Sequence, residues 1–278
     1  RTHTAQCRAG VGGVSKLRVL DLFSGIGGFS LGLERTGGFE TVAFCEIEEF
    51  PRRVLAKHWP DVPCYRDVRE LTAAKLVADG IAVDVITGGF PCQDLSVAGK
   101  GAGLAGARSG LWSEIDRLAG EIRPQFIIVE NVANLLAGPS GQPGGWFCRV
   151  LGDLAERGYD AEWRVIPAWL MGFPHGRDRV WIVAYPKQER RTGILPHFVS
   201  KHEAARFGKN QAAIALAASR HLGERARGNI RGESPFLNGD YGLSAVVGGL
   251  GAGGNAVVPQ IPELIGNAIL ASIKAESL

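Results

Sequence analysis

One cysteine of the chain lies where a thiol could react. Cys92 follows Pro91 in the stretch GGFPCQDLSVAGKG, residues 88–101, which comes directly after the apolar run VDVIT at 83–87. A structural cysteine normally lies inside a strand or helix as a small buried hydrophobe, whereas a thiol in a glycine-flanked loop is positioned to react. The position of Cys92 therefore predicts covalent catalysis by its thiolate.

A carboxylic acid lies at the end of another apolar run. Glu130 belongs to the tripeptide ENV, which closes the run QFIIVENV at residues 125–132. If both runs are strands, Cys92 and Glu130 converge on one crevice. A thiolate beside a proton-donating acid is suited to attack on an electron-poor ring whose nitrogen takes the proton. A solvated strand end, or an ion pair between Glu130 and Arg123, is the simpler alternative and stays open.

A glycine-rich turn follows the first apolar run, in the stretch DLFSGIGGFS at residues 21–30. Three glycines allow a tight turn and a close approach of a ligand to a helix N-terminus: Gly25, Gly27 and Gly28. Glu46, about 20 residues further on, can accept hydrogen bonds from two ribose hydroxyls, and Asp67 is a candidate contact for an adenine edge. Because the glycine spacing is not GxGxxG, the pattern favours an adenosyl ligand without a pyrophosphate over a dinucleotide.

Short apolar runs alternate with amphipathic stretches along the first two thirds of the chain. The runs are rich in β-branched residues, as buried parallel strands are, and they lie at 17–23, 40–47, 83–87, 125–132 and 180–185. Apolar residues three and four positions apart predict helices at 28–37, 48–59, 109–122, 145–158 and, near the end of the chain, 259–273. This order is typical of an α/β doubly wound sheet, in which ligands bind at the carboxyl ends of the strands.

Composition bounds the class of protein. The chain has 278 residues, of which 45% are hydrophobic, and it contains no run of about 18 apolar residues, so we expect a cytoplasmic protein without a membrane span. Its five cysteines are scattered and form no CxxC pair, which argues against a disulfide framework and against a metal site. Residues 187–240 hold ten Lys and Arg against five Asp and Glu. That excess suits a polyanion partner, although a solvated basic surface explains it equally well.

Several motifs together resemble those of a known family. The segments DLFSGIGG, GGFPCQDLSVAGK, SGLWSEI, ENV and GRDRVWIVA occur in this order, and GNAVVP follows near the end. In order and spacing they are similar to the motifs of the DNA (cytosine-5)-methyltransferases of bacteria and phages, over residues 17–186 and 254–272. The resemblance implies a Rossmann-like methyltransferase sheet, S-adenosylmethionine as the cofactor, and methyl transfer to carbon 5 of a cytosine flipped out of duplex DNA.

The resemblance also implies roles for the residues singled out above. Around S-adenosylmethionine it implies Phe23, Gly25, Gly27, Gly28, Glu46, Asp67 and Asn255. In this set Glu46 would hold the ribose and Asp67 the adenine.

At the target cytosine the resemblance implies Cys92, Pro91, Gln93, Glu130, Arg177 and Arg179. Cys92 would be the nucleophile, with its two sequence neighbours positioning it. Glu130 would be the acid at ring nitrogen 3, and Arg179 would be a second contact to the base. The two arginines are also candidate positive charges for lowering the pKa of the Cys92 thiol.

We expect the chain to divide into three parts. Residues 1–186 would form the catalytic domain that binds S-adenosylmethionine, residues 187–247 a reduced target-recognition region, and residues 248–278 a segment whose helix returns to the catalytic domain. The family's QxRxR begins here with His175, its Arg-, Thr- and Pro-containing motif has no clear match, and the glycine-rich VVGGLGAGG precedes Asn255. The catalytic half therefore resembles the family more closely than the recognition half.

Three alternatives to an active DNA methyltransferase stay open at this stage. The first is a catalytically impaired prophage relic that binds cofactor or DNA. The second is an RNA cytosine methyltransferase, disfavoured because that branch has a second proline where Phe90 stands, and the third is a nicotinamide-dependent oxidoreductase, which leaves Cys92 without a use. Duplex DNA is the expected partner and a monomer the expected state, in a bacterial cytoplasm, at the nucleoid, or encoded by a phage. Whether a cognate restriction endonuclease is paired with the protein is left open by the sequence.

Overall fold

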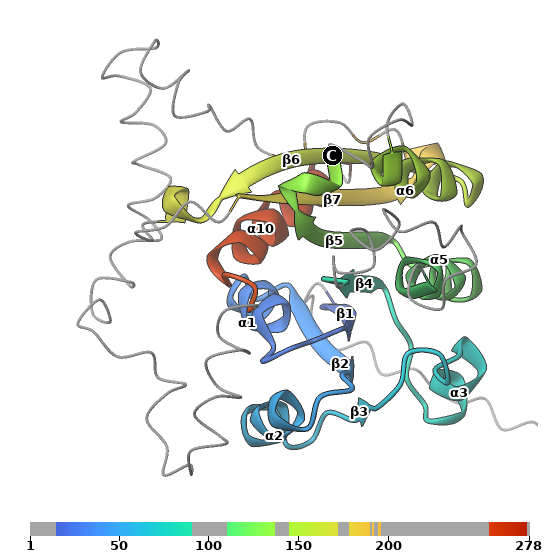
Figure 1. Ribbon diagram of the computed structural model, residues 1–278, viewed down its shortest axis with the longest axis vertical. Helices are drawn as coiled ribbons and strands as arrows, with labels where there is room; N and C mark the ends of the chain where they lie inside the picture. The colour runs from blue at the N-terminus through green and yellow to red at the C-terminus, as the bar shows by residue number, and fades with distance from the viewer. Residues whose placement is uncertain are drawn as a thin grey trace, which may run out of the picture.

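The computed structural model describes residues 15–90, 110–136, 145–171, 178–189, 191, 194–195 and 256–276. Within these residues, seven strands form one sheet in the order β3-β2-β1-β4-β5-β7-β6, with helices on both faces (Figure 1). The strands are β1 (Leu17–Leu22), β2 (Phe39–Cys45), β3 (Cys64–Tyr65), β4 (Val85–Gly88), β5 (Phe126–Val132), β6 (Tyr159–Pro167) and β7 (Asp178–Pro186). The helices are α1 (Gly28–Arg35), α2 (Glu49–His58), α3 (Ala73–Ala78), α5 (Gly110–Ile122), α6 (Gly145–Glu156) and α10 (Gln260–Glu276), with short 3-10 turns at 133–136, 168–171 and 187–189. The prediction of an α/β doubly wound sheet is confirmed.

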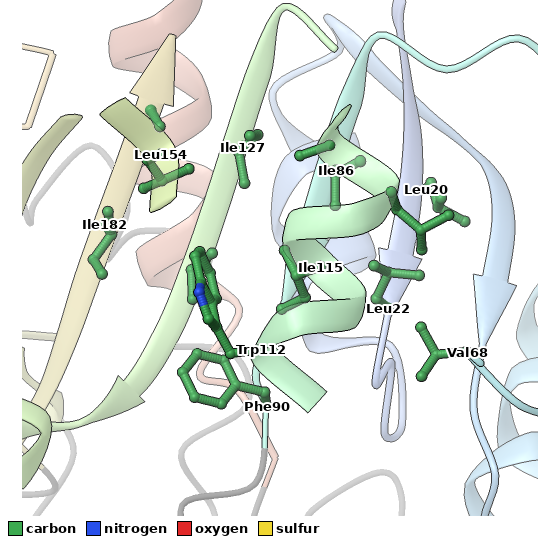
Figure 2. Close-up of a cluster of buried hydrophobic side chains, with 14 of the residues drawn as sticks. Leu20, Leu22, Val68, Ile86, Phe90, Trp112, Ile115, Ile127, Leu154 and Ile182 are labelled. Carbon is green, nitrogen blue, oxygen red and sulfur yellow. The ribbon is translucent and has the colours of Figure 1, made fainter. Parts of the chain in front are cut away.

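The central strands bury side chains on both faces, so helices cover both. In Figure 1, α3, α5 and α6 lie on one side of the sheet and α1, α2 and α10 on the other. Leu20 and Leu22 of β1 belong to the core that also contains Ile115 of α5 (Figure 2), whereas Val19 belongs to the core that contains Ile265 of α10. This alternation along one strand is the two-residue period of a strand packed on both sides. No helix in the described part of the chain is long and apolar enough to cross a membrane.

Strand β7 runs against its neighbours. Strands β3, β2, β1, β4 and β5 are parallel to one another, whereas β7 is antiparallel to both β5 and β6. The expectation that 180–185 forms a parallel strand is therefore wrong, because an apolar run buried on both faces looks the same in either direction. The reversal matters for the site. It brings the start of β7 beside the end of β5, with Arg179 paired to Val132.

The sequence pattern does not predict β3, α3 or β6. Strand β3 has only two residues and α3 only six, so neither gives a usable period. Strand β6 lies at the edge of the sheet and carries two exposed apolar side chains, Trp163 and Val165, so its polar and apolar residues do not alternate cleanly between faces.

Helix α10 packs against α1 at positions where a side chain would collide with backbone. A Cβ atom at Gly28 would lie 2.5 Å from the carbonyl oxygen of Val257, and one at Gly32 would lie 2.2 Å from that of Pro259. Contacts this short do not occur, so glycine at both positions lets the end of the chain reach α1. The expected division of the chain into a catalytic domain, a recognition region and a returning helix stays a prediction.

The residues just beyond β7 are anchored in the same core. Ile194 and Leu195 are buried, and their amides donate hydrogen bonds of 3.2 and 3.1 Å to the carboxylate of Glu162 on β6. The Arg191 guanidinium lies 5.1 Å from the ring centre of Phe126, and its side chain is only 7% exposed. Arg191 is one of the ten basic residues of 187–240 whose excess suits a polyanion partner, yet its side chain is buried. Most of the predicted recognition region lies outside the described residues.

Candidate active site

The described site residues meet at the edge where β1, β2, β4 and β5 end. The amide of Gly25, after β1, donates a hydrogen bond of 2.7 Å to Oε2 of Glu46, after β2. A Cβ atom at Gly89, after β4, would lie 3.2 Å from Oε2 of Glu130 in β5. Parallel strands share one carboxyl edge, and ligands of doubly wound sheets bind there. The carboxyl ends of these strands therefore bring together residues that the sequence predicts to contact a cofactor and residues that it predicts to contact the target cytosine.

The turn after β1 has a left-handed backbone at three positions. Phe23 and Gly25 both have φ of 52°, and Gly27 has φ of 86°. A Cβ atom at Gly25 would meet nothing within 4 Å, so the turn is open at this point. Glu46 is only 7% exposed, and its carboxylate also accepts a hydrogen bond of 2.8 Å from the Glu48 amide through Oε1. Glu46 thus fixes the turn to the end of β2, next to the open side of Gly25.

Gly27 and Gly28 contact protein atoms at the positions where a side chain would stand. A Cβ atom at Gly27 would lie 2.6 Å from the Trp59 ring, and one at Gly28 would meet Val257. The glycines at these positions are explained by packing as well as by the turn. Of the three glycines that the sequence pattern selected, Gly25 faces open space.

Asp67 lies beyond β3 and is held by a neighbouring arginine. Its Oδ1 accepts a hydrogen bond of 2.9 Å from Arg69 Nε, and its Oδ2 lies 2.6 Å from Arg69 Nη2. The hydrogen bonds from Arg69 lower the pKa of the Asp67 carboxyl group, which therefore stays an acceptor near neutral pH. An acceptor of this kind suits an amino group such as that of adenine.

Glu130 and Arg179 form an ion pair across β5 and β7. Glu130 Oε1 lies 2.9 Å from Arg179 Nε, and the two side chains are 11% and 22% exposed. The pair is a diagonal contact of the antiparallel ladder, since Glu130 itself stands opposite Trp181. The alternative partner Arg123 instead donates a hydrogen bond to the carbonyl oxygen of Arg157. The reversed strand therefore supplies the cation that orients the carboxylate.

The end of β5 also holds the last described residue before Cys92. Asn131 Nδ2 donates a hydrogen bond of 3.0 Å to the carbonyl oxygen of Phe90, and both residues are buried. Phe90 is the last described residue of this part of the chain, two positions before Cys92. The approach of Gly89 to Glu130 and the bond from Asn131 to Phe90 tie residues 89 and 90 to the ENV tripeptide.

Asp21 is a buried acid of this edge that the sequence analysis did not select. It is fully buried at the end of β1, and it accepts hydrogen bonds of 2.8 Å from the hydroxyls of Ser30 in α1 and Thr87 in β4. Burial raises the pKa of Asp21 to about 7, and the hydrogen bonds from the two hydroxyls oppose this rise. The signal for it was available: an acid inside the apolar run LRVLDLF requires partners in the interior.

Five of the predicted site residues lie outside the described part of the chain: Pro91, Cys92, Gln93, Arg177 and Asn255. Their roles remain predictions from the sequence. Among the residues that the structure does describe, no group of three His, Cys, Asp or Glu side chains is arranged to hold a metal ion.

Comparison with known proteins adds a family to this geometry. Residues 17–232 match the model of the C-5 cytosine-specific DNA methylases. The chain is 36% identical over 172 residues to the type II methyltransferase M2.BsuMI of Bacillus subtilis, with 60% of this chain and 42% of that protein covered. It is 35% identical over 187 residues to the type II methyltransferase M.Sau3AI of Staphylococcus aureus, with 62% and 44% covered.

A solved structure shares the fold. The crystal structure of a protein described as a DNA modification methyltransferase encoded within an E. coli prophage matches with a TM-score of 0.54 and 26% identity, over 66% of this chain and 51% of that one. The predicted Rossmann-like methyltransferase fold is therefore confirmed. The matched stretch spans less than half the length of the two type II methyltransferases.

Proposed function

Since the chain belongs to the C-5 cytosine-specific DNA methylase family, we propose that it transfers a methyl group from S-adenosylmethionine to carbon 5 of a cytosine in duplex DNA. One observation of the structure carries the proposal furthest. Glu130, fixed by Arg179, lies against Gly89, three positions before Cys92 in the sequence. This contact supports an acid and a thiol that act on the same ring, as addition to a pyrimidine requires.

The residues around Gly25 fit an adenosyl cofactor. The open side of the Gly25 turn leaves room for a ligand beside the lone pairs of Glu46 that two ribose hydroxyls would use. Ile47, the next residue, is 55% exposed and offers an apolar surface for a flat ring, and Asp67 offers an acceptor for an amino group. S-adenosylmethionine would supply an electrophilic methyl group on a positively charged sulfur.

Covalent addition explains why a thiol and an acid are both needed. Carbon 5 of cytosine is a weak nucleophile. When the Cys92 thiolate forms a bond to carbon 6, the electron pair of the ring double bond moves toward ring nitrogen 3, which takes a proton from Glu130. Glu130 pairs with Arg179 in the free protein, so this step requires its carboxyl group to take up a proton when the cytosine binds. Carbon 5 is then an enamine carbon and can attack the methyl group.

Completion of the reaction returns both residues to their starting states. A base removes the proton from carbon 5, the bond between carbon 6 and the Cys92 sulfur breaks, and nitrogen 3 gives its proton back to Glu130. Carbon 6 is inaccessible inside a stacked duplex, so the proposal includes extrusion of the cytosine, at a cost of a few kcal/mol. Arg179 would contact the extruded base. Functional pairing with a restriction endonuclease stays a prediction.

The direct test is methyl transfer from labelled S-adenosylmethionine to plain duplex DNA and, in parallel, to tRNA. Label in the DNA, recovered as 5-methylcytosine, is the expected result. Label in tRNA alone would show that the substrate is RNA and not DNA. Label in neither, with normal binding of S-adenosylmethionine, would contradict catalysis and favour a binding relic.

A Glu46→Ala variant is expected to bind S-adenosylmethionine more weakly while the rate of the chemical step at saturation is nearly unchanged, since the ribose contact is the same in ground and transition states. Loss of two hydrogen bonds to a charged group should cost about 2 to 4 kcal/mol of binding free energy. Isothermal calorimetry and the dependence of rate on cofactor concentration measure the two effects.

Glu34→Ala is the matched control for Glu46→Ala. Glu34 also accepts two N–H hydrogen bonds, from the Thr41 amide at 3.0 Å and from Trp59 Nε1 at 2.9 Å, but it lies near the far end of α1. Its loss should reduce stability without weakening cofactor binding comparably. Equal losses of affinity in the two variants would show that Glu46 acts only through the fold.

A further inference from the structure

Phe90, the last described residue before Cys92, makes an aromatic contact in the core. The rings of Phe90 and Trp112 have centres 5.7 Å apart, and each residue is only 6% exposed. Figure 2 shows the two rings next to each other beside the start of α5, at the edge of the core cluster. The backbone carbonyl oxygen of Phe90 is held by Asn131, and the contact with Trp112 holds its side-chain ring. The orientation of Phe90 therefore depends on the orientation of the Trp112 ring.

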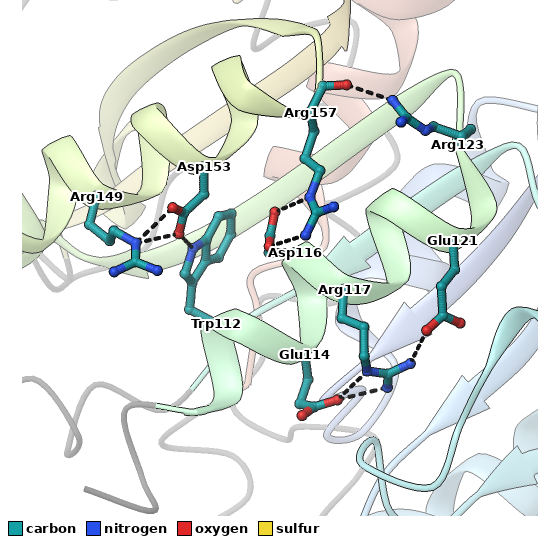
Figure 3. Close-up of polar contacts among 9 residues, drawn as sticks. All are labelled: Trp112, Glu114, Asp116, Arg117, Glu121, Arg123, Arg149, Asp153 and Arg157. Carbon is teal, nitrogen blue, oxygen red and sulfur yellow. Dashed lines mark hydrogen bonds and ion pairs between the residues drawn. The ribbon is translucent and has the colours of Figure 1, made fainter. Parts of the chain in front are cut away.

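The Trp112 ring is in turn fixed from α6. Its Nε1 donates a hydrogen bond of 2.8 Å to Oδ2 of Asp153, and Arg149 Nε lies 2.7 Å from both carboxylate oxygens of that residue (Figure 3). A buried indole N–H needs a partner, and an ionised carboxylate is a strong one. The bond selects one ring orientation, which packing alone would leave less well defined.

We propose that Asp153 and Trp112 are positioning residues for the nucleophile, acting through Phe90, which precedes Cys92 by two positions in the sequence. The inference rests on the proposed function, because it assumes that the Cys92 thiolate attacks the base. Neither residue touches the substrate: the Asp153–Trp112 bond holds a ring, the ring holds Phe90, and Cys92 lies two residues further on. Small displacements of a reacting atom reduce rates strongly, so loss of this support should slow addition to carbon 6.

The same pair of helices provides a matched control. Arg157, directly after α6, and Asp116 of α5 form an ion pair with N–O distances of 2.9 and 2.7 Å (Figure 3). This pair joins α5 to the end of α6, as the Trp112–Asp153 bond joins α5 to α6, but no described contact links it to Phe90. Asp116→Asn therefore tests what weaker helix packing alone does to the reaction.

The experiment compares Asp153→Leu and Trp112→Phe with Asp153→Asn and Asp116→Asn. Asp153→Leu removes the acceptor, Trp112→Phe removes the donor and keeps an aromatic ring, and Asp153→Asn keeps an acceptor oxygen. We expect the first two to lower the rate constant of methyl transfer about five- to tenfold, with KM for S-adenosylmethionine within about twofold of the unchanged chain. Asp153→Asn should restore most of the rate, and Asp116→Asn should lower stability with little effect on rate.

A second readout separates this inference from the proposed function. Hydrogen exchange of the peptide that contains Gly89 and Phe90 should become faster in Asp153→Leu than in Asp116→Asn, whether or not the protein methylates any substrate. If the unchanged chain labels neither DNA nor tRNA, the proposed function fails while the exchange comparison still decides the structural claim. Equal exchange in the two variants, or equal losses of rate, would overturn the positioning role.

Discussion

A Cys92→Ala variant is expected to lose methyl transfer by about a thousandfold or more, while its affinity for S-adenosylmethionine stays within about twofold of the unchanged chain. The reason is chemical. Without addition of a thiolate to carbon 6, carbon 5 does not become nucleophilic enough to take the methyl group. The cofactor contacts proposed for Gly25 and Glu46 do not involve Cys92, so binding should survive. Label transfer to duplex DNA and calorimetric titration of the cofactor measure the two properties.

DNA that carries 5-fluorocytosine at the target tests the covalent step itself. Release of the enzyme requires removal of a proton from carbon 5, and fluorine cannot leave as a cation. The base should therefore be methylated once and remain attached, as a complex that survives denaturation and yields a Cys92 peptide on digestion. Cys92→Ser should form little or none of this complex, because a hydroxyl is a far weaker nucleophile than a thiolate near neutral pH.

The three cysteines that the structure describes are controls with known surroundings. Burial raises the pKa of the Cys45 thiol to about 12 and also raises that of Cys64, so both are poorly ionised near neutral pH. Cys148 is exposed on α6, which makes Cys148→Ser the control for a reactive surface thiol. These replacements should leave trapping intact. Attachment through any of the three, or methyl transfer by Cys92→Ala at a normal rate, would contradict the assignment of the nucleophile.

The sequence predicted the sheet well where the chain alternates long buried strands with amphipathic helices. Helices expected at 28–37 and 109–122 occur at Gly28–Arg35 and Gly110–Ile122. The hydrophobic pattern could not predict the direction of each strand or the strand at the edge of the sheet. The residues of β7 are buried on both faces and give no sign of strand direction, and β6 at the edge exposes Trp163 without a regular period.

The same limits explain what could be foreseen of the site. Glu46 and Glu130 could be predicted from their positions at strand ends. An acid at the end of an apolar run can be recognised without knowing how the strands pair. The ion pair of Glu130 with Arg179 depends on the antiparallel ladder, which only the fold provides. The support of Phe90 by Trp112 and Asp153 joins three segments far apart in the sequence, so no local spacing could indicate it.

Glu130→Gln is expected to slow methyl transfer by about a hundred- to a thousandfold without weakening cofactor binding, since glutamine keeps the shape of the side chain but cannot transfer a proton to ring nitrogen 3. The formation rate of the 5-fluorocytosine adduct should fall by a similar factor, because the proton is needed when carbon 6 is attacked. Asp84→Asn is the matched control. Asp84 also pairs with an arginine, Arg18, at 2.8 Å, but this pair lies at the amino ends of β1 and β4, away from the site. Only stability should change in Asp84→Asn.

Variants of Arg179 complete the test. A positioning ion pair and two independent contacts to the base predict different rates of methyl transfer for the variant in which both Glu130 and Arg179 are replaced. Arg179→Gln removes the cation 2.9 Å from Glu130 Oε1 and should itself slow the reaction by about tenfold or more. If the pair acts as a unit, the variant with both changes should be hardly slower than Glu130→Gln alone. Multiplied losses in the double variant would contradict the unit and assign the two residues separate contacts. A Glu130→Gln protein that methylates DNA at the normal rate would remove the acid from the mechanism altogether.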